Sequence, residues 1–524
     1  MKKIITLSVA ITFSWHVFPQ IIFQKTIGGS NDDKAHAVRQ TADGGYIVAG
    51  STKSFGAGDE DIYLVKADSA GNVSWTKTFG TTAIERANDV EQTADGGYII
   101  GGLTAVSIPG NWNFYIVKTD SSGNYLWSKS FGGTGSEDCR SIKQTTDGGY
   151  IMTGMESSNG PGAGDVFVVR TDSNGNLLWS NTYGEILPDE GYDIAQTTDG
   201  NYIIAGIAYS FTFSGYNSIY LLKINTSGYL LWSKVYYTPD IHNFAYSVCA
   251  TADGGCIVAG ETLDLSAGIE RVLVIKTNAN GIVQWSKTFG GADYEAGFGV
   301  WKTGDGGYII GGATWSFGAS SGDMYLIKTN ATGNVTWSEI LGGPSLDECF
   351  SVRPSKDGGY ILAGISNNDI SLIKTNANGI SGCYDSTITS IVTNPSILFA
   401  NVPTVTYSVA AIAVTPATQT GNGGSITTLC YSVGMDEASA EENTFSLFPN
   451  PATNQLTIAP DASRGELKIE SIEIYNPLGE KVYSNAETSH STAETINITA
   501  LTSGIYFVRV KTSDGMMAGK FVKE

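Results

Sequence analysis

The segment Asp147-Gly-Gly-Tyr-Ile-Met-Thr-Gly154 combines a tight turn with the start of an apolar strand. Similar segments recur along the chain, and the aspartates that begin them are 52, 52, 52, 54, 52 and 52 residues apart. These seven aspartates are Asp43, Asp95, Asp147, Asp199, Asp253, Asp305 and Asp357. So regular a period near fifty residues indicates a repeat protein in which each repeat is one small structural unit.

The composition favours an all-β class. The chain has 524 residues, of which 64 are glycine and only 16% are charged. Turns rich in Gly, Asn and Asp separate short runs rich in Ile, Val, Tyr and Trp, a pattern typical of strands. The formal net charge of −20 argues against nucleic acids and anionic membrane surfaces as partners, because both would be repelled. Cations, neutral glycans and basic proteins remain possible partners.

The second repeat serves as the template for strand assignment. Residues 87–93 alternate as a strand should, and an apolar strand follows a tight turn at 98–103. A third strand is expected at 114–118 and a fourth at 125–131, joined by a Gly- and Asn-containing hairpin turn. Four antiparallel strands in each of seven repeats predict a seven-bladed β-propeller over residues 21–382.

The last repeat lacks a fourth strand where one is expected. A tryptophan begins that strand in the other six repeats, at Trp75, Trp127, Trp179, Trp232, Trp285 and Trp337. Near the other end of the chain, Phe23-Gln-Lys-Thr-Ile-Gly-Gly29 matches Trp75-Thr-Lys-Thr-Phe-Gly80. We therefore expect the N-terminal segment to supply the outer strand of the seventh blade, which would close the ring and cover exposed strand edges.

The repeat resembles kelch-type blades, in which glycines end the second strand and a tryptophan opens the fourth. The resemblance covers residues 21–382. It implies a shape rather than a chemistry, because kelch-like propellers include both binding platforms and enzymes.

Each turn aspartate is preceded, ten residues earlier, by an acid or its amide. These residues are Asp33, Glu85, Glu137, Asp189, Asn243, Glu295 and Asp347. If the first strand is innermost, they surround one mouth of a central channel, where oxygen ligands could bind Ca²⁺ or a polar ligand. The alternative is that each carboxylate caps the backbone amides of a neighbouring loop, and the presence of the residue in every repeat favours that interpretation. No other cofactor is expected.

The loops between second and third strands vary most and are expected on the same face as these carboxylates. They carry aromatic residues at Phe55, Trp112, Phe211, Phe213, Tyr216, Trp315 and Phe317. Aromatic rings beside carboxylates would suit sugar rings, although they could equally pack against neighbouring loops. We take Trp112 and Trp315, together with the seven polar residues, as candidate ligand-binding residues.

A cation ends each third strand and is expected to pair with the turn aspartate of its own repeat on the opposite face. The seven cations are Lys66, Lys118, Arg170, Lys223, Lys276, Lys328 and Lys374. If exposed, such a pair would contribute only about 0–1 kcal/mol.

Two pairs of cysteines are candidates for disulfides. Cys249 and Cys256 flank the turn of the fifth repeat, and we predict a cross-strand disulfide, the alternative being two unrelated core thiols. Cys383 and Cys430 bound a Thr- and Val-rich extension at 383–432, and a disulfide there would contribute on the order of 4 kcal/mol. We expect this extension to form a small β cap or arm beside the last blade.

The N-terminal residues 1–20 have the pattern of a secretory signal peptide, with Lys2 and Lys3 followed by an apolar run. That run is too short for a membrane anchor, so no transmembrane segment is expected in the mature chain. Residues 433–444 are acidic and aperiodic, as in a linker. Residues 445–524 are expected to form a separate, small β-sandwich-like domain.

Four sequence blocks stand out in this last domain. The blocks are Leu447-Phe-Pro-Asn-Pro-Ala452, Ile472-Glu-Ile-Tyr-Asn-Pro-Leu-Gly479, Leu501-Thr-Ser-Gly-Ile-Tyr-Phe-Val508 and Lys520-Phe-Val-Lys523. In their order and spacing they resemble the type A C-terminal sorting domain of cargo of the Bacteroidota type IX secretion system. The resemblance implies export through the periplasm, interaction with the type IX machinery, and a final location in the medium or on the outer cell surface.

The sequence contains no phosphate loop, nucleotide fingerprint or serine-nucleophile motif, and no catalytic residue is assigned. The first functional hypothesis is a non-enzymatic module that binds a glycan or a protein. The second is an extracellular carbohydrate-active hydrolase or lyase that uses two carboxylates of the ring. The third is a structural or adhesion component of the cell surface.

Overall fold

The fold was analysed in a computed structural model, and all of its described elements are β-strands. The described residues are 20–105, 111–158, 164–211, 215–319, 321–408, 412–414, 419–421, 423, 425–434, 445–460, 469–476, 481–485, 493–512 and 515–523. The predicted signal peptide up to residue 19, most of the acidic linker and Phe213 lie outside them. The chain divides into two compact units, one of which is Ile21–Tyr431 and the other of which includes Ser432–Glu524.

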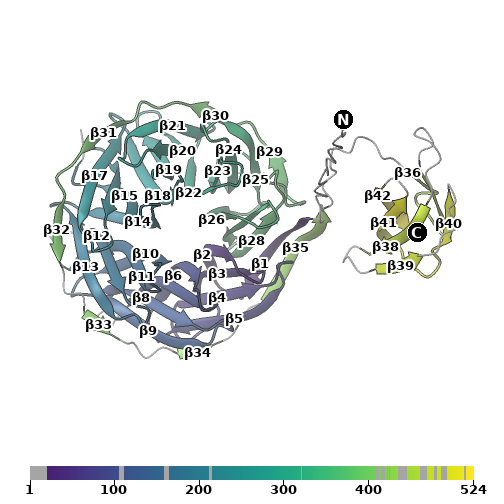
Figure 1. The fold of residues 1–524 in the computed structure, drawn as a ribbon, viewed down its shortest axis with the longest axis horizontal. Coiled ribbons are helices and arrows are strands. Elements are labelled where there is room, and N and C mark those ends of the chain that lie inside the picture. Colours follow the sequence, from purple (N-terminus) through teal and green to yellow (C-terminus); the bar gives the residue numbers. More distant parts are fainter. Residues whose placement is uncertain are drawn as a thin grey trace, which may run out of the picture. The chain divides into compact units, whose positions relative to one another are not determined.

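The first unit contains seven five-stranded antiparallel sheets arranged as a ring (Figure 1). The first sheet contains β2 (Asp33–Gln40), β3 (Tyr46–Thr52), β4 (Asp61–Ala67) and β5 (Val73–Gly80). The second contains β6 (Glu85–Gln92), β7 (Tyr98–Ala105), β8 (Trp112–Thr119) and β9 (Tyr125–Gly132). The third contains β10 (Glu137–Gln144), β11 (Tyr150–Glu156), β12 (Asp165–Thr171) and β13 (Leu177–Gly184).

The next three sheets repeat this order. The fourth contains β14 (Asp189–Gln196), β15 (Tyr202–Ala208), β16 (Ser218–Ile224) and β17 (Leu230–Tyr237). The fifth contains β18 (His242–Ala250), β19 (Cys256–Asp264), β20 (Ile269–Thr277) and β21 (Val283–Gly290). The sixth contains β22 (Glu295–Lys302), β23 (Tyr308–Thr314), β24 (Asp323–Thr329) and β25 (Val335–Leu341).

The seventh sheet joins the two ends of the repeat region. Its strands are β26 (Asp347–Pro354), β27 (Tyr360–Ser366), β28 (Asp369–Thr375) and β1 (Gln20–Gly28). In the antiparallel pairing of β1 with β28, Phe23 lies opposite Lys374 and Ile27 lies opposite Ile370. The innermost strand β26 also contacts β2 of the first sheet. The prediction that the N-terminal segment supplies the fourth strand of the last repeat is therefore confirmed.

The extension after the last repeat encircles the ring instead of forming a cap beside one blade, so that expectation was wrong. Its strands β29 to β34 lie along the circumference, and β35 lies beside β1 (Figure 1). They are β29 (Asp385–Thr387), β30 (Ile391–Thr393), β31 (Leu398–Asn401), β32 (Val405–Ser408), β33 (Ile412–Val414), β34 (Gln419–Gly421) and β35 (Ser425–Gly434). We call residues 385–434 the belt. It adds a fifth strand to every sheet, in the order sixth, fifth, fourth, third, second, first and seventh.

The belt is anchored by a serine that follows the tryptophan in several fourth strands. The hydroxyl groups of Ser233, Ser286 and Ser338 donate to the belt carbonyls of Val402, Pro395 and Ile388 at 2.8, 2.8 and 2.9 Å. Because an uncovered outer strand would expose unpaired backbone groups, the belt protects the edges of all seven sheets.

The cores of the ring lie between neighbouring sheets. Every residue of β3 and of β4 is buried, because both faces of the first sheet are covered by its neighbours. This explains why the second and third strands of each repeat are apolar almost throughout rather than alternating.

Cys249 and Cys256 are free thiols, so the predicted disulfide between them was wrong. In the pairing of β18 with β19, Cys249 lies opposite Ile257, whereas Cys256 lies opposite Ala250. Since neighbouring residues of a strand point to opposite faces, the two thiols belong to different cores. Cys383 is disulfide-bonded, and the side chain of Cys430 lies outside the described residues.

The second unit contains two sheets that share one apolar core. The three-stranded sheet comprises β36 (Phe445–Phe448), β37 (Gln455–Pro460) and β40 (Glu494–Asn497). The four-stranded sheet comprises β39 (Lys481–Asn485), β38 (Ile469–Tyr475), β41 (Gly504–Thr512) and β42 (Gly515–Lys523). Leu456 and Ile458 of one sheet are buried in the same core as Ile472 and Val508 of the other.

Candidate functional site

The turn aspartates and the cations that end the third strands form one ion pair in each repeat, as predicted. The N–O distances are 3.0 Å for Lys66–Asp43, 2.9 Å for Lys118–Asp95, 2.6 Å for Arg170–Asp147, 2.7 Å for Lys223–Asp199, 2.7 Å for Lys276–Asp253, 2.7 Å for Lys328–Asp305 and 2.9 Å for Lys374–Asp357. The cations are buried while the aspartates stay largely exposed. The pairs therefore hold the third strand to the turn, and none of these seven cations is left without an acid.

The seven polar residues at the start of the first strands are buried, and the six acids among them are caps. Each of their side chains is at most 2% exposed, at Asp33, Glu85, Glu137, Asp189, Asn243, Glu295 and Asp347. The six acids accept a backbone N–H from the residue four positions earlier, as in Gly29 to Asp33 at 2.7 Å and Gly343 to Asp347 at 2.8 Å. The capped loop is the one that leads from the previous sheet into the first strand. This placement matches the capping interpretation.

A second acid faces several of these caps across the gap between sheets. A Cβ atom added at Gly80 would meet both Asp61 and Glu85, which places the two carboxyl groups side by side. Burial raises the pKa of Asp61, and the charge of Glu85 raises it further. Burial also raises the pKa of Asp323 to about 6, with a contribution from Asp347. Among the described residues, no three potential ligands are grouped to hold a metal ion.

Trp112 and Trp315 are half-buried; Trp112 begins β8 of the second sheet, and Trp315 directly follows β23 of the sixth. The Arg86 guanidinium lies 5.2 Å from the Trp112 ring centre and pairs with Glu60 at 2.7 Å. The Trp315 ring makes an edge contact with Tyr294 at 4.7 Å between ring centres. Both tryptophans therefore pack partly on neighbouring side chains, while part of each ring remains exposed.

A bulge in every innermost strand turns one further side chain into the centre of the ring. The register shifts by one residue, for example between Ala35 and Ala37 of β2 and between Cys349 and Ser351 of β26. The residues at the bulges are His36, Asn88, Arg140, Tyr192, Tyr246, Phe298 and Phe350, and all seven line one cavity of about 80 Å³. Bulges commonly re-aim side chains in this way. We call this cavity the channel.

Five rings form an arc around one side of the channel. Ring centres are separated by 5.3 Å for Tyr192–Tyr246, 5.6 Å for Tyr246–Phe298, 5.4 Å for Phe298–Phe350 and 5.5 Å for Phe350–His36. The guanidinium of Arg140 lies over Tyr192 at 4.7 Å. Burial lowers the pKa of His36 to about 4, and Lys34 adds to the effect. The arc is therefore apolar and uncharged at neutral pH except where Arg140 continues it.

A charged layer lies next to the arc. Asp89 accepts from Arg39 and from Lys143, each at 2.5 Å. These two cations outweigh the effect of burial and hold the pKa of Asp89 well below its usual range. Asp193 accepts from the hydroxyls of Ser141 at 2.8 Å and Ser247 at 3.1 Å. Side chains from adjacent sheets are thus tied together around the channel.

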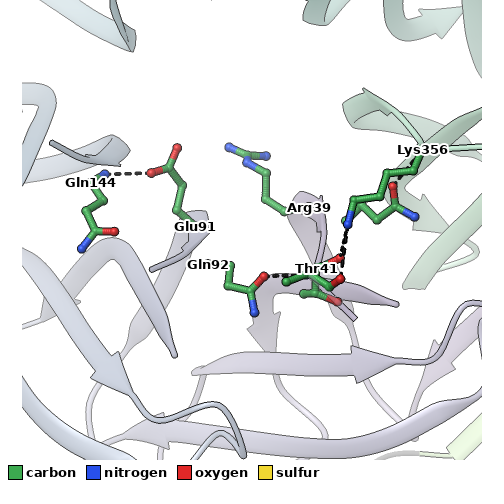
Figure 2. A pocket seen from close by; sticks show the side chains of 8 residues that line it. Arg39, Thr41, Glu91, Gln92, Gln144 and Lys356 are labelled. Atoms are coloured by element: carbon green, nitrogen blue, oxygen red, sulfur yellow. Dashed lines mark hydrogen bonds between the residues drawn. The ribbon is translucent and has the colours of Figure 1, made fainter. Parts of the chain in front are cut away.

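A wider pocket of about 490 Å³, which we call the mouth pocket, is lined by Arg39, Thr41, Glu91, Gln92, Gln144 and Lys356 among others (Figure 2). Arg39 lines both this mouth pocket and the channel. Figure 2 shows the carboxylate of Glu91 accepting from the backbone N–H of Gln144, at 2.7 Å. Lys356 of the seventh sheet donates its backbone N–H to Gln40 of the first, at 2.8 Å. The mouth pocket is therefore polar and has a charged side chain at its inner end.

Sequence reasoning missed the residues of the channel. The available signal was variation among repeats: in the first strand the small residue before the bulge recurs, but the residue at the bulge changes from His36 to Asn88 to Arg140. A position that holds five different residue types in seven repeats, while the residue before it is always small, does not serve the common scaffold.

Comparison with known proteins supports the assignment of the second unit. Residues 446–524 match the family model of the secretion system C-terminal sorting domain. The protein is therefore exported by the type IX secretion system and resides in the medium or on the outer cell surface. No helix in the described part of the chain has the length and hydropathy needed to cross a membrane.

The chain is also similar to other proteins. It is 26% identical over 219 residues to the regulatory protein FlaEY of Caulobacter vibrioides, covering 37% of this chain and 22% of FlaEY. An extracellular domain assigned to a hybrid two-component system of B. thetaiotaomicron superposes with a TM-score of 0.42 at 11% identity, over 95% of this chain and 57% of that one. A protein of unknown function from Dyadobacter fermentans gives 0.41 at 12% identity, over 68% and 99%. Likeness at this level does not inform function.

Proposed function

We propose that residues 21–382 form a seven-bladed, kelch-like β-propeller that acts as a non-enzymatic binding module outside the cell. The pairing of β1 with β28 and the contact of β26 with β2 support a closed ring. The belt and the C-terminal domain complete the chain, and the latter carries the export signal. We further propose that residues 383–432 form a β-rich extension, residues 433–444 a linker, and residues 445–524 the C-terminal secretion domain.

One observation carries the proposal: the bulge residues, which vary among the repeats, all line the channel. Positions that hold the scaffold keep the same chemistry in every repeat, as the seven ion pairs of an aspartate with Lys or Arg show. The bulge positions instead present five rings together with the amide of Asn88 and the guanidinium of Arg140. A ring that needed only to be stable could carry the same small residues in all seven strands.

The favoured ligand is a glycan, with a protein segment as the other candidate. Sugar rings stack on aromatic faces, and the channel and the loops at Trp112 and Trp315 supply such faces together with polar groups. Catalysis by the ring of carboxylates is less well supported, because the six acids are buried and each accepts a backbone N–H as a cap. A purely structural surface role would not explain why the residues that line the channel differ among the repeats.

The test is a glycan array probed with the full chain and with Tyr246→Ala. Leu126→Ala is the matched control, because Leu126 is 52% exposed and lies on a fourth strand away from the channel. We expect glycan binding without product formation, lost in Tyr246→Ala and kept in Leu126→Ala at equal melting temperature. Release of a cleaved sugar, or binding unchanged by Tyr246→Ala, would contradict the proposal.

We further propose that Cys430 is the disulfide partner of Cys383. The other four cysteines, Cys139, Cys249, Cys256 and Cys349, are free thiols. Non-reducing peptide mapping by mass spectrometry checks the pairing, and recovery of Cys430 as a free thiol would contradict it. Such a bond would fasten the end of the belt to its beginning.

A further inference from the structure

We propose that Arg39 and Arg353 form a binding site for the oxyanion group of a small ligand, a carboxylate, sulfate or phosphate, that enters through the mouth pocket. This inference rests on the proposed binding function and specifies the chemistry of its ligand. Arg39 comes from the first sheet and Arg353 from the seventh, so the closure of the ring brings them together.

Arg353 is a cation without a direct counter-charge. Its guanidinium lies 4.2 Å from the Trp301 ring centre, and its Nη1 donates to the carbonyl of Val352 at 2.8 Å. Its Nε is buried and has no hydrogen-bond partner within the described part of the chain. Burial and the charge of Arg39 lower the pKa of Arg353 to about 10, while the charges of Asp193 and Asp89 act in the opposite direction. A buried donor and a desolvated charge left in this state cost free energy unless a ligand pairs with them.

Most other buried cations of the ring pair with an acid, whereas Lys234 donates to the side-chain oxygen of Asn401 instead. Lys66 and its six counterparts each pair with a turn aspartate of their own repeat. Lys143 pairs with Asp89, which it shares with Arg39. Among the described residues, no carboxylate lies within 4.0 Å of a nitrogen of Arg353. The scaffold thus supplies an acid to most of these cations but not to Arg353.

Arg39 gives the site its second donor and its route to solvent. It lines both the channel and the mouth pocket, whereas Arg353 lines the channel. A guanidinium presents a planar set of donors that matches the oxygens of carboxylate, sulfate or phosphate. The inner cavity of about 80 Å³ accommodates a small group, and the mouth of about 490 Å³ has the volume of a typical ligand pocket.

The net charge of the chain restricts where an anion can bind. The chain carries a formal net charge of −20, so most of its surface repels anions. An anion would bind only where local cations outweigh that field, and we expect this at Arg353 in the channel and at Arg39, which lines both the channel and the mouth pocket. A glycan bearing uronic acid or sulfate would combine this group with the stacking faces of the channel, whereas free inorganic anions would use the arginines alone.

The experiment measures binding of sodium sulfate, phosphate and acetate to the full chain by isothermal titration calorimetry at constant ionic strength. The variants are Arg353→Gln and Arg39→Gln, and the matched control is Arg86→Gln, since Arg86 also lies over a tryptophan but pairs with Glu60. We expect saturable binding of at least one anion, weakened by about tenfold or more in both channel variants and unchanged in the control. The order of affinity among the three anions identifies the group.

Melting temperatures provide the second readout. Without anion, Arg353→Gln should not lower the melting temperature, because it removes an unpaired charge, and with anion it should lose the ligand-induced rise seen in the native chain. Equal anion binding by Arg353→Gln and the native chain would overturn the inference, as would the absence of saturable binding. Glycan binding that depends on Tyr246 but not on either arginine would refute the anion site alone, whereas anion binding without any glycan or protein ligand would refute the proposed function.

Discussion

The ring of Phe23 lies 6.1 Å from the ring of Tyr46, with an interplanar angle of 66°. The same relationship recurs between consecutive sheets, at 6.0 Å for Trp75–Tyr98 and Trp127–Tyr150, 5.9 Å for Trp285–Tyr308 and 5.8 Å for Trp337–Tyr360. Phe23 belongs to the seventh sheet and Tyr46 to the first. The N-terminal strand therefore reproduces, across the joint of the ring, the contact that tryptophans make elsewhere.

Replacing Phe23 by Ala should destabilise the ring about as much as replacing Trp75 by Ala. Phe23 is fully buried, and removing such a side chain costs about 3–5 kcal/mol. Chemical denaturation of both variants measures the effect. A Phe23→Ala variant with the stability of the native chain would show that the joint does not depend on this contact.

Gly71 should be more sensitive to substitution than Gly44. Both adopt a positive φ, +73° and +86°, so Ala at either position carries a backbone cost of roughly 1–2 kcal/mol. A Cβ at Gly71 would lie 2.6 Å from the Phe23 ring, whereas a Cβ at Gly44 would meet nothing within 4 Å. Thermal unfolding should therefore give a larger loss for Gly71→Ala. Equal losses would mean that Phe23 does not pack on this turn.

The belt should contribute measurably to stability through its serine anchors. The triple variant Ser233→Ala, Ser286→Ala and Ser338→Ala removes three hydrogen bonds to belt carbonyls, each worth about 1 kcal/mol. We expect a loss of roughly 2–4 kcal/mol in denaturant unfolding.

The control for this triple variant carries alanine at three exposed serines of the hairpin turns, Ser121, Ser173 and Ser227. It should unfold like the native chain. If the anchor variant behaves the same way, the belt is not held by these contacts.

Asp189 should make the ring less stable as the pH rises through 6. Burial raises the pKa of Asp189 to about 6 from an ordinary value of 3.8. The folded chain therefore holds this proton more tightly than the unfolded chain, and the resulting stabilisation, present below pH 3.8, is lost as the pH rises through 6, by about 3 kcal/mol.

Asp189→Asn removes this titration, so its stability relative to the native chain should increase between pH 4 and pH 7. The difference between the two denaturation midpoints across that range is the informative quantity, since other titrating groups cancel from it. A constant difference would show that Asp189 has an ordinary pKa.

Much of the ring was predictable because its signals are local and repeated seven times. The Asp-Gly-Gly turns fix the hairpins, the tryptophans mark the fourth strands, and Phe23 could be matched to Trp75 by sequence alone. The Asp–Lys pairs followed from strand ends that lie on one face.

Three features were not predictable from such signals. The belt strands β29 and β30 have three residues each, and so short a Thr- and Val-rich run does not specify the strand with which it pairs. The faces of Cys249 and Cys256 depend on the register around one turn, where a shift of a single residue exchanges the faces. The bulges are properties of strand pairing, so the inward aim of Tyr246 and Phe350 emerges only from the assembled sheets.

The central claim is that the N-terminal strand closes the ring, because the channel and the placement of Arg39 and Arg353 along it depend on this closure. Hydrogen exchange of the full chain, followed by mass spectrometry, tests it most directly. Since β1 lies between β28 and β35, the amides of residues 20–28 should exchange as slowly as those of β5 at 73–80. Rapid exchange of 20–28 while β5 stays protected would contradict the closed ring and the channel built on it.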